Sequence, residues 1–307
     1  MKKIIEVTNF AKSYGEVKAV RGISFYVEEG KLFSFLGPNG AGKSTTIDTL
    51  CTLMTFDSGE VTINGFDLKT QAESIRQCIG VVFQDSVLDR LLTVRENLLI
   101  RAGLYSRSGS EAKRMVDEAV KVIELSEFIN RPYGKLSGGQ RRRADIATAL
   151  LHKPKILFLD EPTTGLDPQT RLNVWETVKN LQEKSGMTIF LTTHYMEEAA
   201  DSDYITVIDH GKIAASGTPQ ELKTEYSSDV LRAVTINDEA AMQMQKQLAE
   251  RGVKYSVDGG VISVKLPDTM ASIAILDSCK QHISSFQVLQ GSMDDAFIGI
   301  TGKGLRQ

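Results

Sequence analysis

The chain has 307 residues and a formal net charge of −3 at pH 7, which is enough length for one large domain and a smaller one. This charge balance provides no general basic field, so the composition argues against wholesale nucleic-acid binding. No run of about 18 apolar residues occurs, so the sequence predicts no membrane span of its own.

Cysteine and histidine usage gives no sign of a metal site. Cys51, Cys78 and Cys279 are scattered without C-x-x-C spacing. They are typical of small packing residues in a reducing compartment. None of the four histidines is spaced as a ligand with another histidine or a cysteine. The sequence therefore predicts no structural metal site.

The first part of the chain mixes short β-rich segments with helical patterns. Apolar runs bounded by turn residues predict strands over residues 4–10, 20–27, 31–36, 61–68 and 79–83. Asn64-Gly65 is a hairpin-turn sequence inside the fourth of these segments. A helix is expected over residues 43–53, and a helical pattern covers residues 88–135.

Two later segments, residues 156–159 and 188–191, are continuous apolar runs. Such runs are typical of strands in a parallel sheet that is covered on both faces. Helical segments lie between and after them. The alternation predicts an α/β core with helices on both sides of the sheet.

The composition changes near residues 217–219, and a short helix is expected over residues 220–226, capped by Thr218 with Pro219 at its first position. The segments that follow have the order β-α-β-β-α-β, with strands over 230–236, 254–257, 261–266 and 286–289 and helices over 239–251 and 270–281. We therefore expect two domains, residues 1–226 and a small ferredoxin-like α+β domain over residues 227–307. The polar tail from Lys303 is expected to fray.

A glycine-rich loop at residues 37–44 has the pattern G-x-x-x-x-G-K-[ST]. Because a predicted strand precedes it and a predicted helix follows, backbone N–H groups and a helix N-terminus point at one spot. Lys43 is expected to neutralise β/γ-phosphate charge, and the Ser44 hydroxyl is expected to ligate Mg²⁺. A chance glycine-rich loop is the alternative, and the strand–loop–helix context disfavours it.

Two carboxylates, Asp160 and Glu161, follow the apolar run at residues 156–159. Asp160 is placed to hold Mg²⁺ through its water shell, and Glu161 is placed to polarise an attacking water. Water is a poor nucleophile at neutral pH, so hydrolysis needs such a base. Acidic residues at a strand end are also often plain surface residues, so this pair alone leaves both interpretations open.

A second glycine-rich segment, Leu136-Ser137-Gly138-Gly139-Gln140, precedes a helix that extends through Leu151. Ser137 is a good N-cap, and the glycines expose N–H groups at the positive end of the helix. The segment is therefore a candidate for a second anion site. The alternative is a linker, which the helix directly after it disfavours.

The sequence resembles the ATP-binding-cassette (ABC) ATPases over about residues 1–225. The resemblance is carried by GPNGAGKST at 37–45, LSGGQ at 136–140, ILFLDEP at 156–162, GLD at 165–167 and His194. It implies a P-loop NTPase core with an antiparallel β subdomain and a helical subdomain at about residues 88–150. It also implies an ATPase that uses ATP and Mg²⁺.

The resemblance assigns further roles. Tyr14 is expected to stack on adenine; otherwise it is a core or turn aromatic. Gln84 is expected to touch Mg²⁺ and the attacking water, Asp167 to make a contact across a dimer beside Glu161, and His194 to contact the γ-phosphate. A lone histidine is otherwise a satisfied core residue. The phosphate-binding loop is expected to comprise Gly37, Pro38, Asn39, Gly40, Ala41, Gly42, Lys43, Ser44 and Thr45.

In this family a second ATPase subunit completes the site, and here we expect it to be an identical chain. The residues that would close over its γ-phosphate are Ser137, Gly138, Gly139 and Gln140. ATP then holds the two copies together, and hydrolysis releases them.

The leading function is the ATP-hydrolysing subunit of an ABC transporter that moves a separate integral membrane permease docked near residues 85–97. The chain is then cytoplasmic and peripheral on the inner face of the cell membrane. Residues 291–302 resemble the end of daunorubicin-resistance-type and ABC-2 exporter ATPases, which favours export of a drug, lipid or other amphipathic cargo.

The alternatives are an import ATPase, a soluble non-transport ABC ATPase and a nucleotide-gated protein without turnover. Intact Glu161 and His194 argue against the last. The basic cluster at residues 141–143 suggests RNA or lipid contact, but cations near bound nucleotide or in surface pairs suffice, so no nucleic-acid partner is expected. The cargo, the permease and the role of the C-terminal domain are not specified by this sequence.

Overall fold

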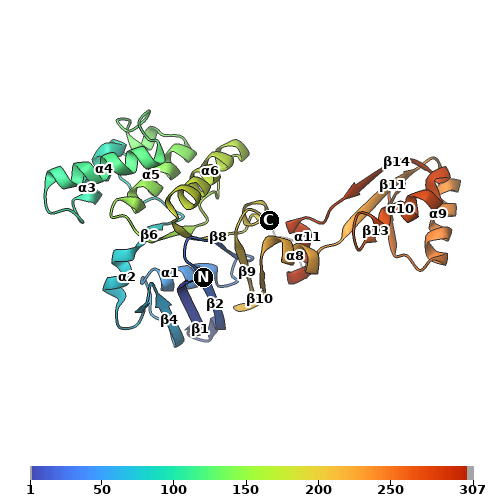
Figure 1. The fold of residues 1–307 in the computed structure, drawn as a ribbon, viewed down its shortest axis with the longest axis horizontal. Helices are drawn as coiled ribbons and strands as arrows, with labels where there is room; N and C mark the ends of the chain where they lie inside the picture. Colours follow the sequence, from blue (N-terminus) through green and yellow to red (C-terminus); the bar gives the residue numbers. More distant parts are fainter. Residues whose placement is uncertain (1, 303–307) are drawn as a thin grey trace. The chain divides into compact units, whose positions relative to one another are not determined.

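The computed structural model describes residues 2–302 (Figure 1). A six-stranded sheet forms the centre of the part that precedes residue 219. Five of its strands are parallel and β10 pairs antiparallel at one edge; in sheet order they are β10 (Lys212–Gly217), β9 (Tyr204–Asp209), β3 (Leu32–Leu36), β8 (Thr188–Thr193), β7 (Ile156–Asp160) and β6 (Ile79–Val82). The carboxyl ends of the parallel strands therefore share one edge of the sheet.

Strand β7 is buried on both faces, as its continuous apolar sequence predicts. Leu157 and Leu159 pack in one hydrophobic cluster, whereas Ile156 and Phe158 pack in another. Since successive side chains of a strand point to opposite faces, β7 contributes to two cores at once. The expected α/β core is confirmed.

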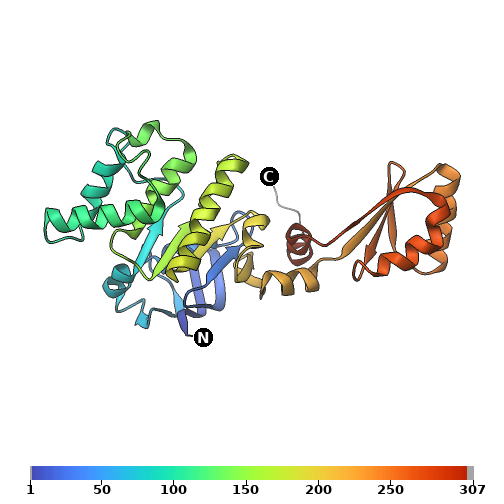
Figure 2. The same ribbon diagram turned by 45° about the horizontal axis from the view of Figure 1, so that its top comes forward.

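A helical layer covers the face of the sheet on which Leu157 and Leu159 lie, as Figures 1 and 2 show. The pattern over residues 88–135 was expected to be helical throughout, but left-handed Glu124 ends one helix and irregular chain precedes the next. The layer contains α3 (Val94–Ala102), α4 (Gly109–Ile123), the 3₁₀ turn Tyr133–Lys135, α5 (Gly138–Leu150) and α6 (Pro168–Ser185).

The opposite face packs against α1 (Lys43–Leu50) and a second, antiparallel sheet. This sheet contains β2 (Val17–Glu28), β1 (Lys3–Tyr14), β4 (Ser58–Ile63) and β5 (Phe66–Asp67). The predicted strand at residues 61–68 is a hairpin that turns at Asn64-Gly65, where both residues have positive φ. The antiparallel β subdomain is thus present.

Several elements were not predicted. Helix α2 (Ala72–Cys78) is short and has only two buried residues, so its apolar period is weak. The hairpin of β9 and β10 buries the four central residues of β9 but leaves four of the six residues of β10 exposed or partly exposed. The short helix α7 (Met196–Ala199) follows β8. All three cysteines are free and buried, as expected for packing residues.

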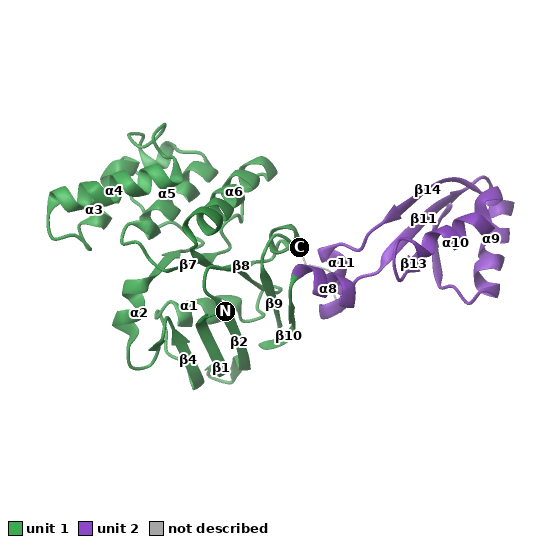
Figure 3. Cartoon of the chain, in the orientation of Figure 1, with its two compact units in different colours: residues 1–218 green, residues 219–307 purple. Residues whose placement is uncertain are grey.

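The chain divides into two compact units, Met1–Thr218 and Pro219–Gln307 (Figure 3). The expected boundary lay after residue 226, but α8 (Pro219–Tyr226) belongs to the second unit because it packs against α11 (Met293–Thr301). The tail from Lys303 that was expected to fray lies outside the described residues. Within the part that the structure describes, no helix combines the length and the hydropathy of a membrane span.

The second unit contains an antiparallel sheet whose strand order is β12-β13-β11-β14. Helices α9 and α10 contribute with it to one hydrophobic core, which includes Leu231, Met244 and Ile275. The predicted order β-α-β-β-α-β is present, as β11 (Asp229–Thr235), α9 (Asp238–Glu250), β12 (Tyr255–Asp258), β13 (Val261–Leu266), α10 (Ala271–Cys279) and β14 (Ile283–Leu289).

Candidate nucleotide site

The glycine-rich loop connects β3 to α1 at the carboxyl edge of the central sheet. Gly40 and Gly42 have φ of 79° and 109°, a region that L side chains rarely adopt, and Gly42 is the N-cap of α1. Gly37 is required for close approach, since a Cβ there would lie 2.3 Å from the carbonyl oxygen of Ile208. The loop therefore has the strand–loop–helix form that binds phosphates.

Lys43 is folded back over its own loop. Its Nζ donates to the carbonyl oxygens of Gly37 at 2.7 Å and Pro38 at 3.3 Å. The residue is 5 % exposed, and this burial lowers the pKa of Lys43 from its ordinary value. Ser44, by contrast, is exposed. The loop thus holds a poorly solvated cation beside an accessible hydroxyl.

The Glu161 carboxylate lies where three segments meet. Its Oε1 is 3.6 Å from Lys43 Nζ, and its Oε2 is 3.2 Å from His194 Nδ1. The hydroxyl of Thr164 donates to Oε2 at 3.0 Å. Three residues singled out from separate motifs are therefore in contact: Lys43 at the start of α1, Glu161 after β7 and His194 after β8.

The backbone at Glu161 is itself unusual. Its φ is 43°, in the left-handed region that a side chain disfavours. Its N–H donates to the carbonyl oxygen of Thr192 at 3.1 Å and to the Thr192 hydroxyl at 3.0 Å. Such strained positions persist when the surroundings fix them, and they cluster at functional sites. Here the strained backbone turns the carboxylate toward Lys43.

Asp160 has a different environment from Glu161. The Thr192 hydroxyl donates to its Oδ1 at 2.6 Å. Burial raises the pKa of Asp160, and the neighbouring Glu161 charge acts in the same direction, while Thr192 and Lys43 oppose it. Asp160 is partly buried, and among residues 2–302 no cation lies within ion-pair distance of it, so its carboxylate is suited to hold one. Asp48 on α1 is also partly buried, and burial together with Asp160 raises its pKa.

The position of His194 is fixed by hydrogen bonds of neighbouring residues and not by hydrogen bonds of its ring. Thr193 donates to Glu198 Oε2 at 2.7 Å, and Thr163 donates to the other oxygen of Glu198. The His194 Nδ1 atom is buried and makes no hydrogen bond of acceptable geometry, although Glu161 lies close. The Nδ1 side of the ring is therefore turned toward Glu161 and covered from solvent.

The Ser137 segment forms the start of α5. Ser137 is its N-cap: its hydroxyl accepts from Gln140 N at 3.3 Å, and Gln140 Oε1 accepts from Ser137 N at 3.1 Å. Added Cβ atoms on Gly138 and Gly139 would lie 2.7 Å from Leu166 and 2.5 Å from Thr170. The two glycines thus have a packing reason in addition to exposed N–H groups. Among the described residues, no hydrogen bond or ion pair joins Ser137–Gln140 to Lys43 or to the Glu161 side chain.

Asp167 caps α6 and accepts from Thr170 N at 3.0 Å, and hydrogen bonds from Thr170 lower its pKa. Because Leu166 and Thr170 contact Gly138 and Gly139, the first turns of α5 and α6 are adjacent. Asp167 therefore lies near the Ser137 segment.

Gln84 and Tyr14 are accessible. Gln84 follows the end of β6 at Val82 and is exposed. Tyr14 ends β1 and is 49 % exposed, with its hydroxyl 3.1 Å from Met54 Sδ and Lys12 Nζ 5.5 Å from its ring centroid. It is therefore not a core aromatic. Neither residue contacts the Glu161 cluster through an interaction seen in residues 2–302.

Some residues around the site were not predicted. Thr164 and Thr192 orient the two carboxylates, but threonines carry no sequence signal for that role. Arg142 belongs to the basic cluster at residues 141–143, for which cations near nucleotide or in surface pairs were considered sufficient. It is not in a surface pair, because it is 7 % exposed and donates to backbone carbonyls.

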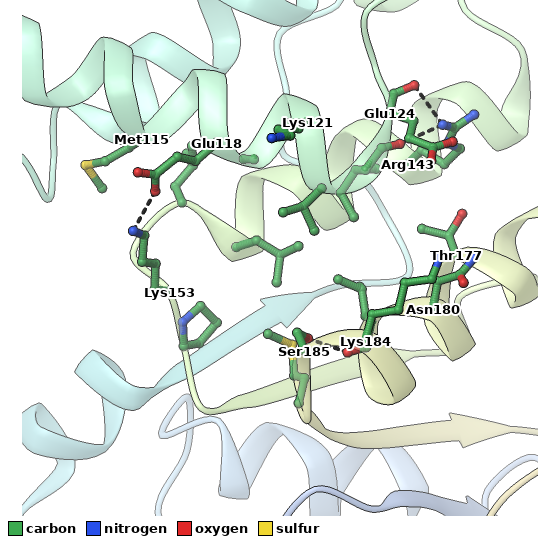
Figure 4. A pocket seen from close by; sticks show the side chains of 18 residues that line it. Met115, Glu118, Lys121, Glu124, Arg143, Lys153, Thr177, Asn180, Lys184 and Ser185 are labelled. Atoms are coloured by element: carbon green, nitrogen blue, oxygen red, sulfur yellow. Dashed lines mark hydrogen bonds and ion pairs between the residues drawn. The ribbon is translucent and has the colours of Figure 1, made fainter.

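A separate cavity of about 720 Å³ lies at the other end of β7, away from the carboxylates (Figure 4). Residues of α4, α5 and α6 line it together with Lys153 and Pro154, which precede β7. Lys153 forms an ion pair with Glu118 across its mouth at 2.5 Å. This cavity is not part of the Glu161 cluster.

Comparison with known proteins places this geometry in a family. Residues 20–164 match the sequence profile of the ABC transporter family. The chain is 35% identical over 314 residues to the linearmycin resistance ATP-binding protein LnrL of Bacillus subtilis, with 99% of this chain and 100% of the relative covered. It is 38% identical over 307 residues to the daunorubicin/doxorubicin resistance ATP-binding protein DrrA of Streptomyces peucetius, with 98% and 93% covered.

A solved structure with a similar fold is the dimeric post-hydrolysis state of the ATP-binding cassette MJ0796 bound to ADP and Pi. Its TM-score is 0.63 at 32% sequence identity, and the match covers 70% of this chain and 98% of that one. The structure of cbiO1 from Clostridium perfringens, part of the ABC transporter complex cbiONQ, has a TM-score of 0.68 at 27% identity and covers 82% and 98%.

Proposed function

The chain belongs to the ABC transporter family as an ATP-binding and ATP-hydrolysing subunit, and from this premise we propose that two copies clamp ATP between them to drive an export permease. One observation carries the hydrolytic part of this proposal. It is the contact of the Glu161 carboxylate with both Lys43 and His194 at the carboxyl edge of the sheet.

Glu161 is the general base in this proposal. Its carboxylate faces the Lys43 ammonium, and both groups are poorly solvated. Phosphate oxygens offer Lys43 a stronger acceptor than the loop carbonyls, because charge-assisted hydrogen bonds are the stronger ones. Once Lys43 binds phosphate, Glu161 is free to accept a proton from an attacking water. His194, which lies beside Glu161, then contacts the γ-phosphate.

The site also fits Mg²⁺. A carboxylate and a hydroxyl are ligands that this ion prefers, and Asp160 and Ser44 provide them. Asp160 is partly buried, burial raises its pKa, and its Oδ2 accepts no hydrogen bond among the described residues, so a cation there would stabilise its charge. When bound, Mg²⁺ supplies charge neutralisation at the phosphates. Gln84 is the third residue that we assign to this ion and to the attacking water.

We infer a dimer because the Ser137 segment makes no hydrogen bond or ion pair with Lys43 or the Glu161 side chain of its own chain among the described residues. The loop of one chain provides only one wall for the nucleotide, so the start of α5 from a second copy supplies the other. The hydroxyl of Ser137 already accepts a hydrogen bond in the helix cap, which leaves its proton to donate to a phosphate oxygen. Gly138, Gly139 and Gln140 add helix N-terminal charge. Asp167, next to this segment, makes the contact across the interface.

Tyr14 provides the adenine platform in this scheme. Its ring is half exposed at the end of β1, so a base can stack on it. The phosphate contacts come from the remaining loop residues, Pro38, Asn39, Ala41 and Thr45 with the three glycines.

The permease docks on residues 85–97. Large apolar side chains are exposed there and just beyond: Val87 at 56%, Leu91 at 88%, Ile100 at 59% and Leu104 at 72%. Exposed apolar patches of this kind mark protein–protein contacts. Docking to a permease would hold the chain on the cytoplasmic face of the membrane. Two relatives are named resistance ATP-binding proteins, which favours export of an amphipathic compound over import.

The test of hydrolysis is Glu161→Gln in the purified chain, with phosphate release and binding of a fluorescent ATP analogue as readouts. We expect turnover to fall by at least about 10²–10⁴-fold, the effect of a positioned acid–base group, while ATP binding is retained. Glu197→Gln is the matched control, since Glu197 is an exposed acid on the neighbouring helix α7. Full turnover in Glu161→Gln would refute the assignment of the base.

A further inference from the structure

Arg142 is a buried cation that binds four backbone carbonyl oxygens. Its Nε donates to Pro162 O at 2.5 Å, and its Nη2 donates to Glu161 O at 3.2 Å. Its Nη1 donates to Phe83 O at 2.6 Å, and Nη2 also reaches Gln84 O at 3.4 Å. One side chain thus bridges the segment after β6 to the segment after β7. These are the two segments that carry Gln84 and Glu161.

No carboxylate lies within ion-pair distance of this guanidinium among the described residues. Burial lowers the pKa of Arg142, with the charges of Asp145, Tyr133, Asp160 and Asp85 acting in the opposite direction. Burying a cation without a direct counter-ion is costly, and an apolar side chain of similar volume is often better for stability. The position therefore has a reason other than stability.

A second residue of α5, Asp145, also contacts the segment after β6, about one turn beyond Arg142. Asp145 accepts from the Ser86 hydroxyl at 2.6 Å and from the Tyr133 hydroxyl at 3.0 Å. Burial raises the pKa of Asp145, so this carboxylate is also set in a poorly solvated site. Residues 83–86 are therefore attached to α5 through two charged side chains at positions 142 and 145.

We propose that Arg142 is a positioning residue for ATP hydrolysis, which fixes the backbone of Gln84 and Glu161 against helix α5. The inference rests on the roles proposed for Glu161, Gln84 and the start of α5. Arg142 touches neither the reacting atoms nor the nucleotide. Its effect is on the direction of the two side chains whose carbonyl groups it holds.

This arrangement links both ATP sites of the proposed dimer. The Ser137 end of α5 serves the nucleotide bound by the partner, whereas the carbonyls that Arg142 holds belong to the chain's own site. Displacement of α5 on closure therefore moves Gln84 and Glu161 with it. Through Asp145 and Ser86, the same connection reaches the first residues of the docking segment.

Arginine is required for this geometry. Its planar fork has five N–H donors, enough to span two segments at once. Lysine keeps the charge but is a point donor on a flexible stem, so it cannot hold both segments in fixed relative positions. Arg142→Lys is thus a substitution that preserves charge while removing the bridge.

The experiment compares Arg142→Lys with Arg143→Lys in the full chain. Arg143 lies on the same helix and also donates to two backbone carbonyls, Ile123 O at 2.6 Å and Glu124 O at 2.8 Å, but on the wall of the separate cavity (Figure 4). For Arg142→Lys we expect kcat to fall by about 10- to 100-fold, since a misplacement of 1 Å can cost 10²-fold. Affinity for a fluorescent ATP analogue should stay near wild type, and Arg143→Lys should keep kcat within about twofold, as expected for a change outside the site.

Hydrogen exchange provides a readout that a merely structural role does not predict. In Arg142→Lys, amides in residues 83–86 and 161–164 should exchange faster, with the P-loop and the β1–β2 hairpin unchanged. Wild-type kcat, or equal loosening throughout the unit, would overturn the proposal.

Ser86→Ala keeps the test decisive if Arg142→Lys does not fold, because Ser86 is exposed and its loss removes one bond to Asp145. We then expect faster exchange over 83–86 and a several-fold lower kcat, and no change in either would contradict us. Failure of the base assignment itself would show separately, as turnover by Glu161→Gln.

Discussion

At the residue scale, the site is a set of charges held in a poorly solvated place. Lys43 is buried and its pKa is lowered, Asp160 is partly buried and its pKa is raised, and Glu161 lies beside both on a strained backbone. Burial disfavours the charged forms of Lys43 and Asp160 relative to water. Binding of phosphates and a cation relieves this condition, so the electrostatics favour the loaded state.

Lys43→Ala separates binding from folding. We expect ATP affinity to fall by about 10- to 100-fold, because a hydrogen bond to a charged group contributes about 1.5–3 kcal/mol. We expect the free energy of unfolding without nucleotide to change by less than about 1–2 kcal/mol, because burial already works against the charged lysine. Isothermal titration with ATP and urea unfolding measure the two quantities. Unchanged affinity would contradict the proposed cradle, and so would an affinity loss explained by unfolding.

Separate motifs in the sequence assigned Lys43 and His194 to the phosphates and Glu161 to the attacking water, but they did not specify that the three side chains contact one another. The contact follows from the sheet, since the P-loop, Glu161 and His194 come after the parallel strands β3, β7 and β8, whose carboxyl ends share one edge. The sequence did not predict the role of Arg142. Three consecutive arginines occupy three directions around a helix, and only the packing of α5 decides which one is buried. The hydroxyls of Thr164 and Thr192 were also beyond prediction, since their partners are chosen by the fold.

At the scale of elements, the segment between β6 and α3 exposes large side chains to solvent. It presents Leu91, 88% exposed, and an exposed Arg90 whose side chain makes no hydrogen bond or ion pair among residues 2–302. Its inner side is different, since Asp89 N donates to buried Asn97 and the chain after Gln84 is fixed to α5. A rigid base with an apolar exposed tip suits a docking element.

The double substitution Arg90→Glu with Leu91→Asp tests this segment. We expect loss of co-purification with the membrane subunit, because truncation of a central contact residue often costs about 2 kcal/mol or more. Basal ATPase activity of the isolated chain should persist. Met242→Asp on α9, where Met242 is 68% exposed, is the control for adding an acid to a surface methionine. Normal recovery of the permease with the double variant would show that this surface is the wrong one.

Prediction of helices and strands succeeded where the hydrophobic pattern was clear. The runs that became β7 and β8 are buried on both faces, and the β-α-β-β-α-β order of the second unit is present. It was less accurate where tertiary contacts set the bounds. The expected helix over residues 88–135 is interrupted, and β14 begins at Ile283, before two exposed serines that carry no apolar signal.

At the scale of the whole molecule, the proposed dimer draws two half-sites from each chain. One contains the P-loop with Glu161 and His194, and the other is formed by the adjacent N-termini of α5 and α6 with Ser137 and Asp167. Within residues 2–302 no hydrogen bond or ion pair joins the side chains of the two half-sites. Arg142 on α5 connects them indirectly, since it donates to the backbone carbonyls of Gln84 and Glu161. Two copies in opposite orientation would complete both halves, which is the isologous arrangement usual in homodimers.

The second unit has a core of its own, formed by α9, α10 and the sheet. Its fold could be predicted from the order of its elements. Its role could not, because the sequence of this unit shows no cluster of catalytic residues. The division at Thr218 differs from the predicted one because packing of α8 against α11 outweighs the linker-like sequence at 227–228.

The most direct measurement is a crystal structure of the Glu161→Gln protein with ATP trapped in it. We predict a dimer in which Ser137 Oγ and Gly139 N of one protomer lie within hydrogen-bond distance of the γ-phosphate held by Lys43 of its partner. A nucleotide enclosed by a single chain, with Ser137 and Gly139 far from every phosphorus atom of the opposing protomer, would contradict the account.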